Sequence, residues 1–216
     1  MLLSQENKET PEAGFLHIVN LIGLENPTYI ELGGFALNGG GAVKPGEGSG
    51  VLAIRPGTHP FTLRNAGARP ETVTGDFTME AGKTVAIICY DEGKVYRDGS
   101  EEVKLRHTVL AESDTTGPRL SLVSLLRAPS VVVEVSGDSV TLSARRAFQK
   151  KVALGDEIHI LHQGRTLAEF AIDRPVHHIG FLYQKAGSGG VELSLIEQEK
   201  LEYQPPLETE AGEDAE

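Results

Sequence analysis

One stretch of this chain occurs twice, and this internal repeat limits the possible folds more than any other feature. Each copy begins with a run of apolar and β-branched residues, passes through a proline-bearing connection into a second such run, and ends in a tight turn. Short apolar runs bounded by turn residues are typical of β-strands. The sequence therefore predicts two similar all-β domains in tandem. The first copy comprises residues 16–22, Pro27, residues 28–32 and residues 33–34, and the second comprises residues 120–126, Pro129, residues 131–135 and residues 136–138.

Length and composition agree with two domains of this kind. The 216 residues leave room for two domains of about 100 residues each. The chain contains 25 glycines, 11 prolines and no tryptophan, which is a composition rich in turns. We expect about seven short strands in each copy, as in a two-sheet sandwich. The predicted fold class is all-β, with two tandem immunoglobulin-like β-sandwich domains related by the internal repeat.

The repeat also sets the expected domain boundaries. Both ends of the chain are polar, and the segment between the two copies, AESDTTGPR, is short and polar. We expect the two sandwiches either to be separate beads or to share an edge. The predicted organisation is a flexible leader at 1–14, sandwich 1 at 15–110, a linker at 111–119, sandwich 2 at 120–203, and a disordered acidic tail at 204–216.

The order of the motifs resembles that of a known bacterial family. The motifs are Asn20-Leu21, Pro27, residues 29–34 (YIELGG), residues 56–59 (PGTH) and residues 81–84 (AGKT). In this order, with the glycine-rich loop between them, they are similar to the DUF4397 family. The resemblance implies immunoglobulin-like sandwiches that are often in tandem and often exported. It supplies no activity and no catalytic residue.

The expected location depends on whether a signal peptide preceded this sequence. Residues 1–14 lack the apolar core of a signal peptide. No run of about 18 apolar residues occurs, so we expect no transmembrane segment. We expect the periplasm or the cell surface if a signal was removed, and the cytoplasm otherwise.

The charge of the chain argues against a nucleic-acid partner and leaves one local basic segment. The formal net charge is −11, and no basic patch suited to phosphates is evident. Against this acidic background, we predict a protein-binding surface over residues 145–151, because such a cationic segment could dock an acidic partner. The alternative is a solvated loop. The predicted contact residues are Arg145, Arg146, Phe148, Lys150 and Lys151.

Four histidines near the end of the chain raise the question of a metal site. His159 and His162 are three residues apart, and His177 and His178 are adjacent, so on regular strands each pair points to opposite faces. A cross-strand pair of His162 with His177 or His178 stays open. We predict no metal and no cofactor, with these histidines at the surface or at strand edges.

The glycine-rich residues 33–50 have two interpretations. Eight glycines in eighteen residues are compatible with a phosphate-binding loop. That loop requires Gly-Lys-Ser/Thr or a glycine turn that opens a helix, whereas this stretch leads into the apparent strand 51–54. We therefore expect a structural hairpin or loop, with contact to a partner as a further use.

Other reactive residues have structural explanations. Cys89 lies in an apolar run and is expected to be buried. Glu31 and Glu134 occupy matched positions of the two copies, so they do not flank one cleft as glycosidase carboxylates do. No serine-hydrolase elbow and no His-Glu-x-x-His motif occurs.

These observations favour a protein that is not an enzyme. We expect an interaction or assembly module of the bacterial cell envelope, with a protein partner and no nucleic acid. The alternative is a carbohydrate-binding or hydrolytic protein that uses the loops at one end of a sandwich. A cytoplasmic scaffold is the third candidate.

Overall fold

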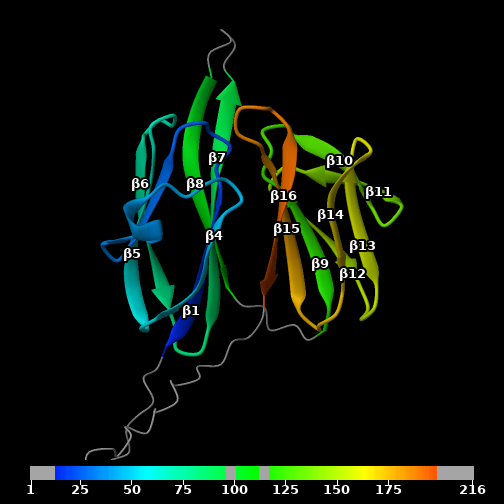
Figure 1. The fold of residues 1–216 in the computed structure, drawn as a ribbon, viewed down its shortest axis with the longest axis horizontal. Helices are drawn as coiled ribbons and strands as arrows, with labels where there is room; N and C mark the ends of the chain where they lie inside the picture. Colours follow the sequence, from blue (N-terminus) through cyan, green and yellow to red (C-terminus); the bar gives the residue numbers. More distant parts are fainter. Residues whose placement is uncertain (1–12, 96–100, 112–116, 199–216) are drawn as a thin grey trace, which may run out of the picture.

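The computed structural model describes residues 13–95, 101–111 and 117–198, and these form sixteen β-strands and one short 3-10 helix, η1 (Figure 1). The first half contains β1 Gly14–Leu21, β2 Thr28–Leu32, β3 Phe35–Ala36, η1 Leu37–Gly40, β4 Gly48–Ile54, β5 Gly57–Asn65, β6 Thr72–Met79, β7 Thr84–Val95 and β8 Glu101–Ala111. The second half contains β9 Arg119–Ser124, β10 Ser130–Val135, β11 Asp138–Ser143, β12 Ala147–Lys151, β13 Glu157–His162, β14 Arg165–Ala171, β15 His177–Gln184 and β16 Val191–Gln198.

The two halves have the same sheet topology. In the first half, sheet A has the strand order β4-β1-β7-β8 and sheet B has the order β3-β2-β5-β6. In the second half, sheet C is β12-β9-β15-β16 and sheet D is β11-β10-β13-β14. Adding eight to each strand number of the first half reproduces the second. The predicted fold class of two tandem β-sandwich domains related by a repeat is therefore confirmed, with eight strands in each half.

The gap between the two halves falls within the predicted linker 111–119. Of this linker, residues 112–116 lie outside the described residues, as do residues 1–12 of the predicted leader and the whole predicted acidic tail 204–216. Gly14, which we assigned to the leader, already belongs to β1. No helix in the described part of the chain is long and apolar enough to span a membrane.

Each sandwich has its own apolar core between its two sheets. Along β10, the side chains of Val131, Val133 and Val135 are buried while Val132 and Glu134 are exposed, which is the alternation of a strand with one face inward. The largest buried side chains of sandwich 1 include Leu16, Phe61 and Leu63, and the core of sandwich 2 includes Leu122, Ile160 and Leu182.

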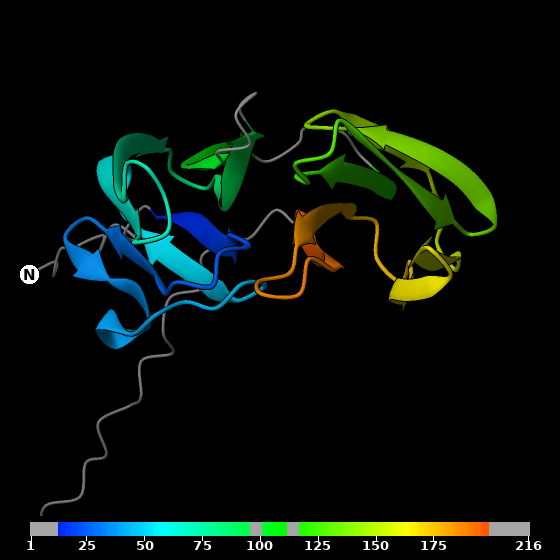
Figure 2. The ribbon, with the colours of Figure 1, turned by 90° about the horizontal axis from the view of Figure 1, so that it is seen from above.

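A third apolar core lies between the two sandwiches, where sheet A packs on sheet C (Figures 1 and 2). β1, and β7 over residues 85–89, are therefore buried on both faces, which explains why these stretches are mostly apolar. The two sandwiches neither stand apart as beads nor share an edge. This core comprises Val19, Leu21, Ala86, Ile88, Tyr90, Leu110, Val123, Leu125, Ile179, Phe181, Tyr183 and Ile196.

Equivalent residues of the two halves make this third core. The ladder between β1 and β7 pairs Val19 with Ile88, and the ladder between β9 and β15 pairs Val123 with Phe181. Continuing these registers assigns all twelve residues of the third core to six equivalent pairs, one of which is Tyr90 with Tyr183. The same face of each sandwich thus contacts the other, and we call this contact the junction.

Candidate functional site

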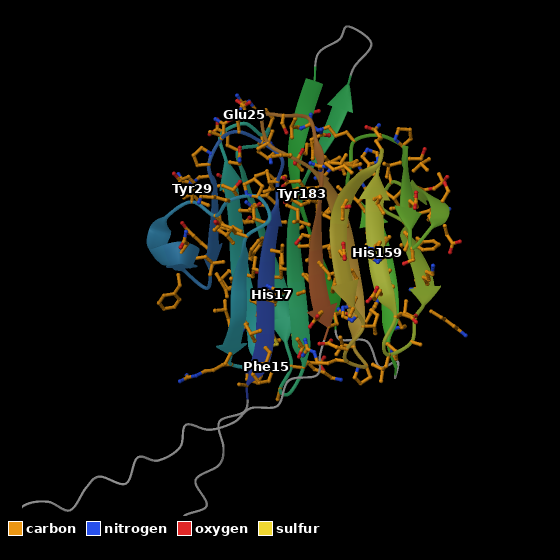
Figure 3. All side chains as sticks on the ribbon, turned by 45° about the vertical axis from the view of Figure 1, so that its right-hand side comes forward. Phe15, His17, Glu25, Tyr29, His159 and Tyr183 are labelled. Carbon is orange, nitrogen blue, oxygen red and sulfur yellow. The ribbon has the colours of Figure 1, made fainter. Side chains whose placement is uncertain are left out.

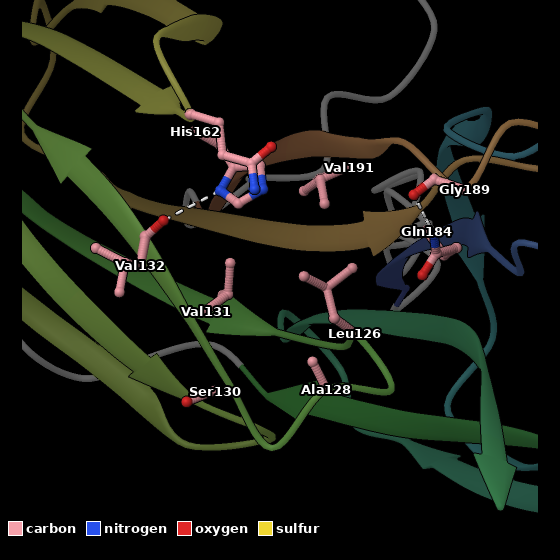
Figure 4. A pocket seen from close by; sticks show the side chains of 10 residues that line it. Leu126, Ala128, Ser130, Val131, Val132, His162, Gln184, Gly189 and Val191 are labelled. Carbon is pink, nitrogen blue, oxygen red and sulfur yellow. Dashed lines mark hydrogen bonds between the residues drawn. The ribbon is translucent and has the colours of Figure 1, made fainter. Parts of the chain in front are cut away.

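The open end of sandwich 2 contains a cavity of about 440 Å³, which we call the end cavity (Figure 4). Its walls come from the β9–β10 connection, the start of β10, the β13–β14 turn and the β15–β16 turn with the adjoining strand ends. A cavity of this size at a loop-bearing end of a sandwich is typical of a binding site. The lining residues are Leu126, Ala128, Ser130, Val131, Val132, His162, Gln163, Gln184, Gly189 and Val191.

The end cavity exists because one connection of sandwich 2 is short. β13 and β14 are joined by the two residues Gln163 and Gly164, whereas β5 and β6 of sandwich 1 are joined by residues 66–71. In sandwich 1 this longer loop places Ala68 in the core with its side chain fully buried. The strand registers also put His162 where sandwich 1 has the buried Leu63. A shorter turn and a more polar residue together leave the end of sandwich 2 open.

His162 is the ionisable group of the end cavity. Its Nδ1 atom lies 3.0 Å from the carbonyl oxygen of Val132 (Figure 4). Because a carbonyl only accepts hydrogen bonds, Nδ1 carries the hydrogen, and Nε2 of the neutral ring is then an acceptor. The remaining walls are mostly aliphatic, from Leu126, Val131 and Val191. The ten lining residues include no carboxylate and no cysteine, so this cavity is suited to binding an apolar group beside a few polar contacts.

The surrounding contacts hold the walls of the end cavity in place. The guanidinium of Arg165 donates to the carbonyl oxygen of Val191, and the Gln184 amide donates to the carbonyl oxygen of Gly189. Next to the buried Leu126, the Arg127 side chain donates to the Asp91 carboxylate across the junction, at 2.9 Å. The β9–β10 wall is thereby anchored to sandwich 1.

A serine–histidine pair lies at the opposite end of sheet C, and no motif in the sequence predicted it. The hydroxyl of Ser121 is 2.8 Å from Nε2 of His177. Nδ1 of this ring faces the Arg119 guanidinium at 3.3 Å, in the place where a catalytic triad has a carboxylate. A cation there disfavours the imidazolium, and burial and Arg119 together lower the pKa of His177. Ser121 is also buried, so its hydroxyl is not exposed for attack on a substrate.

The five predicted partner-binding residues differ in exposure and in the contacts they make within the chain. On β12, Phe148 packs against the core of sandwich 2, and Lys150 is 3.0 Å from Asp138. Arg145 reaches across the junction to Glu92, at 2.7 Å, while Arg146 and Lys151 are exposed. A hydrogen bond from Arg106, together with the nearby charge of Arg145, lowers the pKa of Glu92. The cations that a partner could reach most readily are thus Arg146 and Lys151, and the predicted surface stays a prediction.

Arg145 is the counterpart of Gly46 in the glycine-rich loop. Both have positive φ, and both donate their backbone N–H to equivalent carbonyls, Asn20 for Gly46 and Ser124 for Arg145. Gly46 lies against the hydroxyl of Tyr183, which is located between the two sandwiches (Figure 3). The glycine-rich loop therefore contacts the second sandwich of the same chain.

The four histidines lie in four different surroundings. His159 is on β13 beside Glu169 and Glu157, at 3.6 and 3.9 Å (Figure 3). His162 lines the end cavity and His177 faces Ser121. His178 is buried, tilted against the Phe170 ring, with the Glu197 carboxylate 3.6 Å from Nδ1. Within the described residues, no three histidine, cysteine or acidic side chains are grouped as metal ligands.

Cys89 is fully buried in the core of sandwich 1, as we expected from its apolar surroundings. Burial raises the pKa of its thiol strongly. The thiol therefore stays protonated and packs as an apolar group.

No family model matches this chain, and no curated protein matches its sequence. The resemblance to the DUF4397 family therefore stays a prediction.

Proposed function

We propose that this chain is a non-catalytic interaction module that binds a protein partner in the end cavity of sandwich 2. The cavity itself is the observation that supports this function. It is about 440 Å³ in volume and mainly aliphatic, with its polar side chains from Ser130, His162, Gln163 and Gln184. This volume suits one or two apolar side chains of a partner.

The fixed position of the walls supports binding by a preformed site. Leu126 is part of the core of sandwich 2, and the adjacent Arg127 is held by Asp91 of sandwich 1. A preformed cavity avoids the entropy cost of ordering loops during binding. A carbohydrate site would instead stack sugar rings on exposed aromatic side chains, and the lining residues include none.

The proposal can be tested by closing the cavity with a large side chain at its rim. Ala128 is exposed beside the cavity, so Ala128→Trp fills the entrance without disturbing a core. Ala153 is exposed in the β12–β13 connection, far from the cavity, so Ala153→Trp is the matched control. Peptides selected from a random display library against the wild-type chain are the probe. We expect peptides with an apolar anchor that bind the Ala153→Trp variant normally and lose at least tenfold in affinity for Ala128→Trp.

Two results would count against this function. Selected peptides that bind Ala128→Trp as well as wild type would show that the cavity is not the binding site. Turnover in a general hydrolase panel, or a specific signal on a glycan array that Ala128→Trp abolishes, would favour the carbohydrate-binding or hydrolytic alternative. The location in the cell envelope stays a prediction.

A further inference from the structure

Sandwich 1 has a cavity of its own at a different place, with a volume of about 430 Å³. It lies between the edge strand β4 and the 3-10 helix η1, and we call it the side cavity. Its walls are mainly apolar, and its rim carries a carboxylate, an amide and a hydroxyl. The lining residues are Ile18, Ile30, Leu37, Asn38, Val43, Glu47, Gly48, Ser49 and Leu52.

Two local differences between the copies border the side cavity. In sandwich 1, Ala36 pairs with Glu31 and Val43 with Thr28, so seven positions separate the two partners. In sandwich 2 the equivalent partners, Ser139 and Leu142, are three positions apart. The four additional residues correspond in number to η1, Leu37–Gly40.

The second difference is a bulge in β4. Between His17 and Val19 of β1, the partner strand advances from Val51 to Gly48, which is one residue more than a regular ladder. At this bulge the Ser49 hydroxyl accepts a hydrogen bond from the N–H of Ile18, at 3.0 Å. A small residue thus stands at this point of the edge strand.

In sandwich 2 an aromatic ring occupies the equivalent place. Phe148 pairs with Leu122 on the regular strand β12, and Leu122 is the equivalent of Ile18. The ring of Phe148 packs against the core of sandwich 2. The side cavity of sandwich 1 therefore has room for a phenyl group that its own sequence does not supply at this position.

An unburied phenyl group lies close by in the sequence. Phe35 on β3 is 79 % exposed, the most exposed of the large apolar side chains in the described residues. It precedes the cavity-lining Leu37 by two residues. This exposure shows that Phe35 does not fill the side cavity of its own chain.

We propose that a second copy of this chain fills the side cavity, with Phe35 of each copy inserted into the cavity of the other. A ring and a cavity on neighbouring parts of one surface suit a two-fold symmetric contact, in which both insertions occur at once. Two phenyl rings bury about 300–500 Å². This area is smaller than the roughly 1,200–2,000 Å² of stable protein interfaces, so the dimer is weak and dependent on concentration. The site is on sandwich 1, and the proposal is independent of the end cavity.

The test is the mass of the full chain in solution, by sedimentation equilibrium up to millimolar concentration. We expect the wild-type mass to rise from 23.2 kDa towards twice that value. Phe35→Ser removes the ring, and Ser49→Phe fills the cavity as Phe148 fills its counterpart, so each variant should stay monomeric. Leu52→Phe is a second filling variant if Ser49→Phe fails to fold. Leu154→Ser, which removes an exposed side chain of sandwich 2 away from both cavities, is the control and should dimerise normally.

Mixing the variants gives the sharpest result. An equimolar mixture of Phe35→Ser and Ser49→Phe retains one ring and one cavity that fit, so it should form a heterodimer weaker than the wild-type dimer. A wild-type chain that stays monomeric at millimolar concentration would overturn the proposal, and so would a dimer that survives Phe35→Ser. Neither result bears on peptide binding by the end cavity, which is measured with Ala128→Trp.

Discussion

Arg127 and Asp91 join the two sandwiches by a hydrogen-bonded ion pair at 2.9 Å. Because of the internal repeat, an equivalent contact with different residues lies on the other side of the junction. The strand registers identify Gly23 as the counterpart of Arg127, and Gln184 as the counterpart of Asp91. Gly23 lies directly against the carbonyl oxygen of Gln184. The junction therefore has an ion pair on one side and a close approach of two backbones on the other.

Replacing Asp91 with alanine should destabilise the fold strongly. The Asp91 side chain is 5 % exposed and accepts hydrogen bonds from Arg127 and from the N–H of Gly23, at 2.6 Å. Its removal leaves both donors without this acceptor in a mostly buried position, at a cost of about 2–4 kcal/mol. Urea unfolding measures this change. Glu71→Ala is the control, because the Arg69–Glu71 pair is exposed and should matter by less than about 0.5 kcal/mol. Equal effects of the two variants would contradict the importance of the Asp91 contact.

A methyl group added at the junction should also lower the free energy of unfolding. In Gly23→Ala the new carbon meets the Gln184 carbonyl oxygen, so the backbones must move apart, which costs about 1–3 kcal/mol. In Gly46→Ala the methyl meets the Tyr183 hydroxyl at 2.7 Å, and a φ of +84° adds strain. Gly190→Ala is the control, since its nearest neighbour is the flexible Ser188 side chain. Thermal unfolding of all three variants tests this, and an unchanged Tm for Gly23→Ala would refute the tight junction.

Acidification should destabilise the protein through its buried histidines. Burial lowers the pKa of His178, despite the charges of Glu197 and Asp173, so the folded state binds fewer protons than the unfolded state. The stability that neutral His178 contributes is therefore complete above the unfolded pKa of about 6.5 and is lost as pH falls below it. We expect the free energy of unfolding to decrease between pH 7.5 and pH 5.5.

A substitution at His178 separates the contribution of this residue to the pH dependence of stability. His178→Leu should reduce the pH slope by up to about 1.4 kcal/mol per pH unit, the limit for one proton. Burial also lowers the pKa of His17, His107 and His177, so part of the slope should persist. Ile160→Val is the control, because it removes a buried methyl group without changing titration, and its slope should equal that of wild type. If His178→Leu keeps the wild-type pH slope, His178 does not contribute to the pH dependence of stability.

Phe148→Ala should act on stability and not on a partner surface. The ring is half-buried against the core of sandwich 2, so its loss should cost about 2 kcal/mol, less than for a fully buried phenylalanine. Arg146→Ala and Lys151→Ala, at exposed positions, should change the free energy of unfolding by less than about 0.5 kcal/mol. Guanidinium unfolding distinguishes the two classes. An unchanged free energy of unfolding in Phe148→Ala would mean that this ring does not fill the space beside Leu122.

The fold was predictable from the sequence because the repeat places apolar strand residues and turn residues at matched positions of the two copies. The repeated apolar runs 16–22 and 120–126 lie at the equivalent strands β1 and β9 of the structure. The contact between sheets was harder to predict. A strand such as β1, apolar on both faces, indicates that two layers cover it, but it does not say which sheet supplies the second layer.

The candidate sites were less predictable because they depend on small differences between the copies. The end cavity results from a two-residue turn at Gln163, and the side cavity borders a bulge at Ser49. Neither the short turn nor the bulge alters the apolar pattern of the strands. The basic residues at 145–151 form a cluster in the sequence. In the structure, strand alternation directs their side chains to two faces of the sheet, and Arg145 is paired with Glu92. A cluster of basic residues in the sequence does not show which of them already form ion pairs within the chain.

The equivalence of the two faces at the junction makes the chain comparable to a homodimer whose subunits have been fused. A single sandwich produced alone would present its half of the six residue pairs to water, and its best cover would be another sandwich of the same kind. The covalent connection replaces that bimolecular encounter with an intramolecular one at high effective concentration. Each half is thereby freed from having to remain identical to the other, so an opening can develop in one half while its counterpart stays closed.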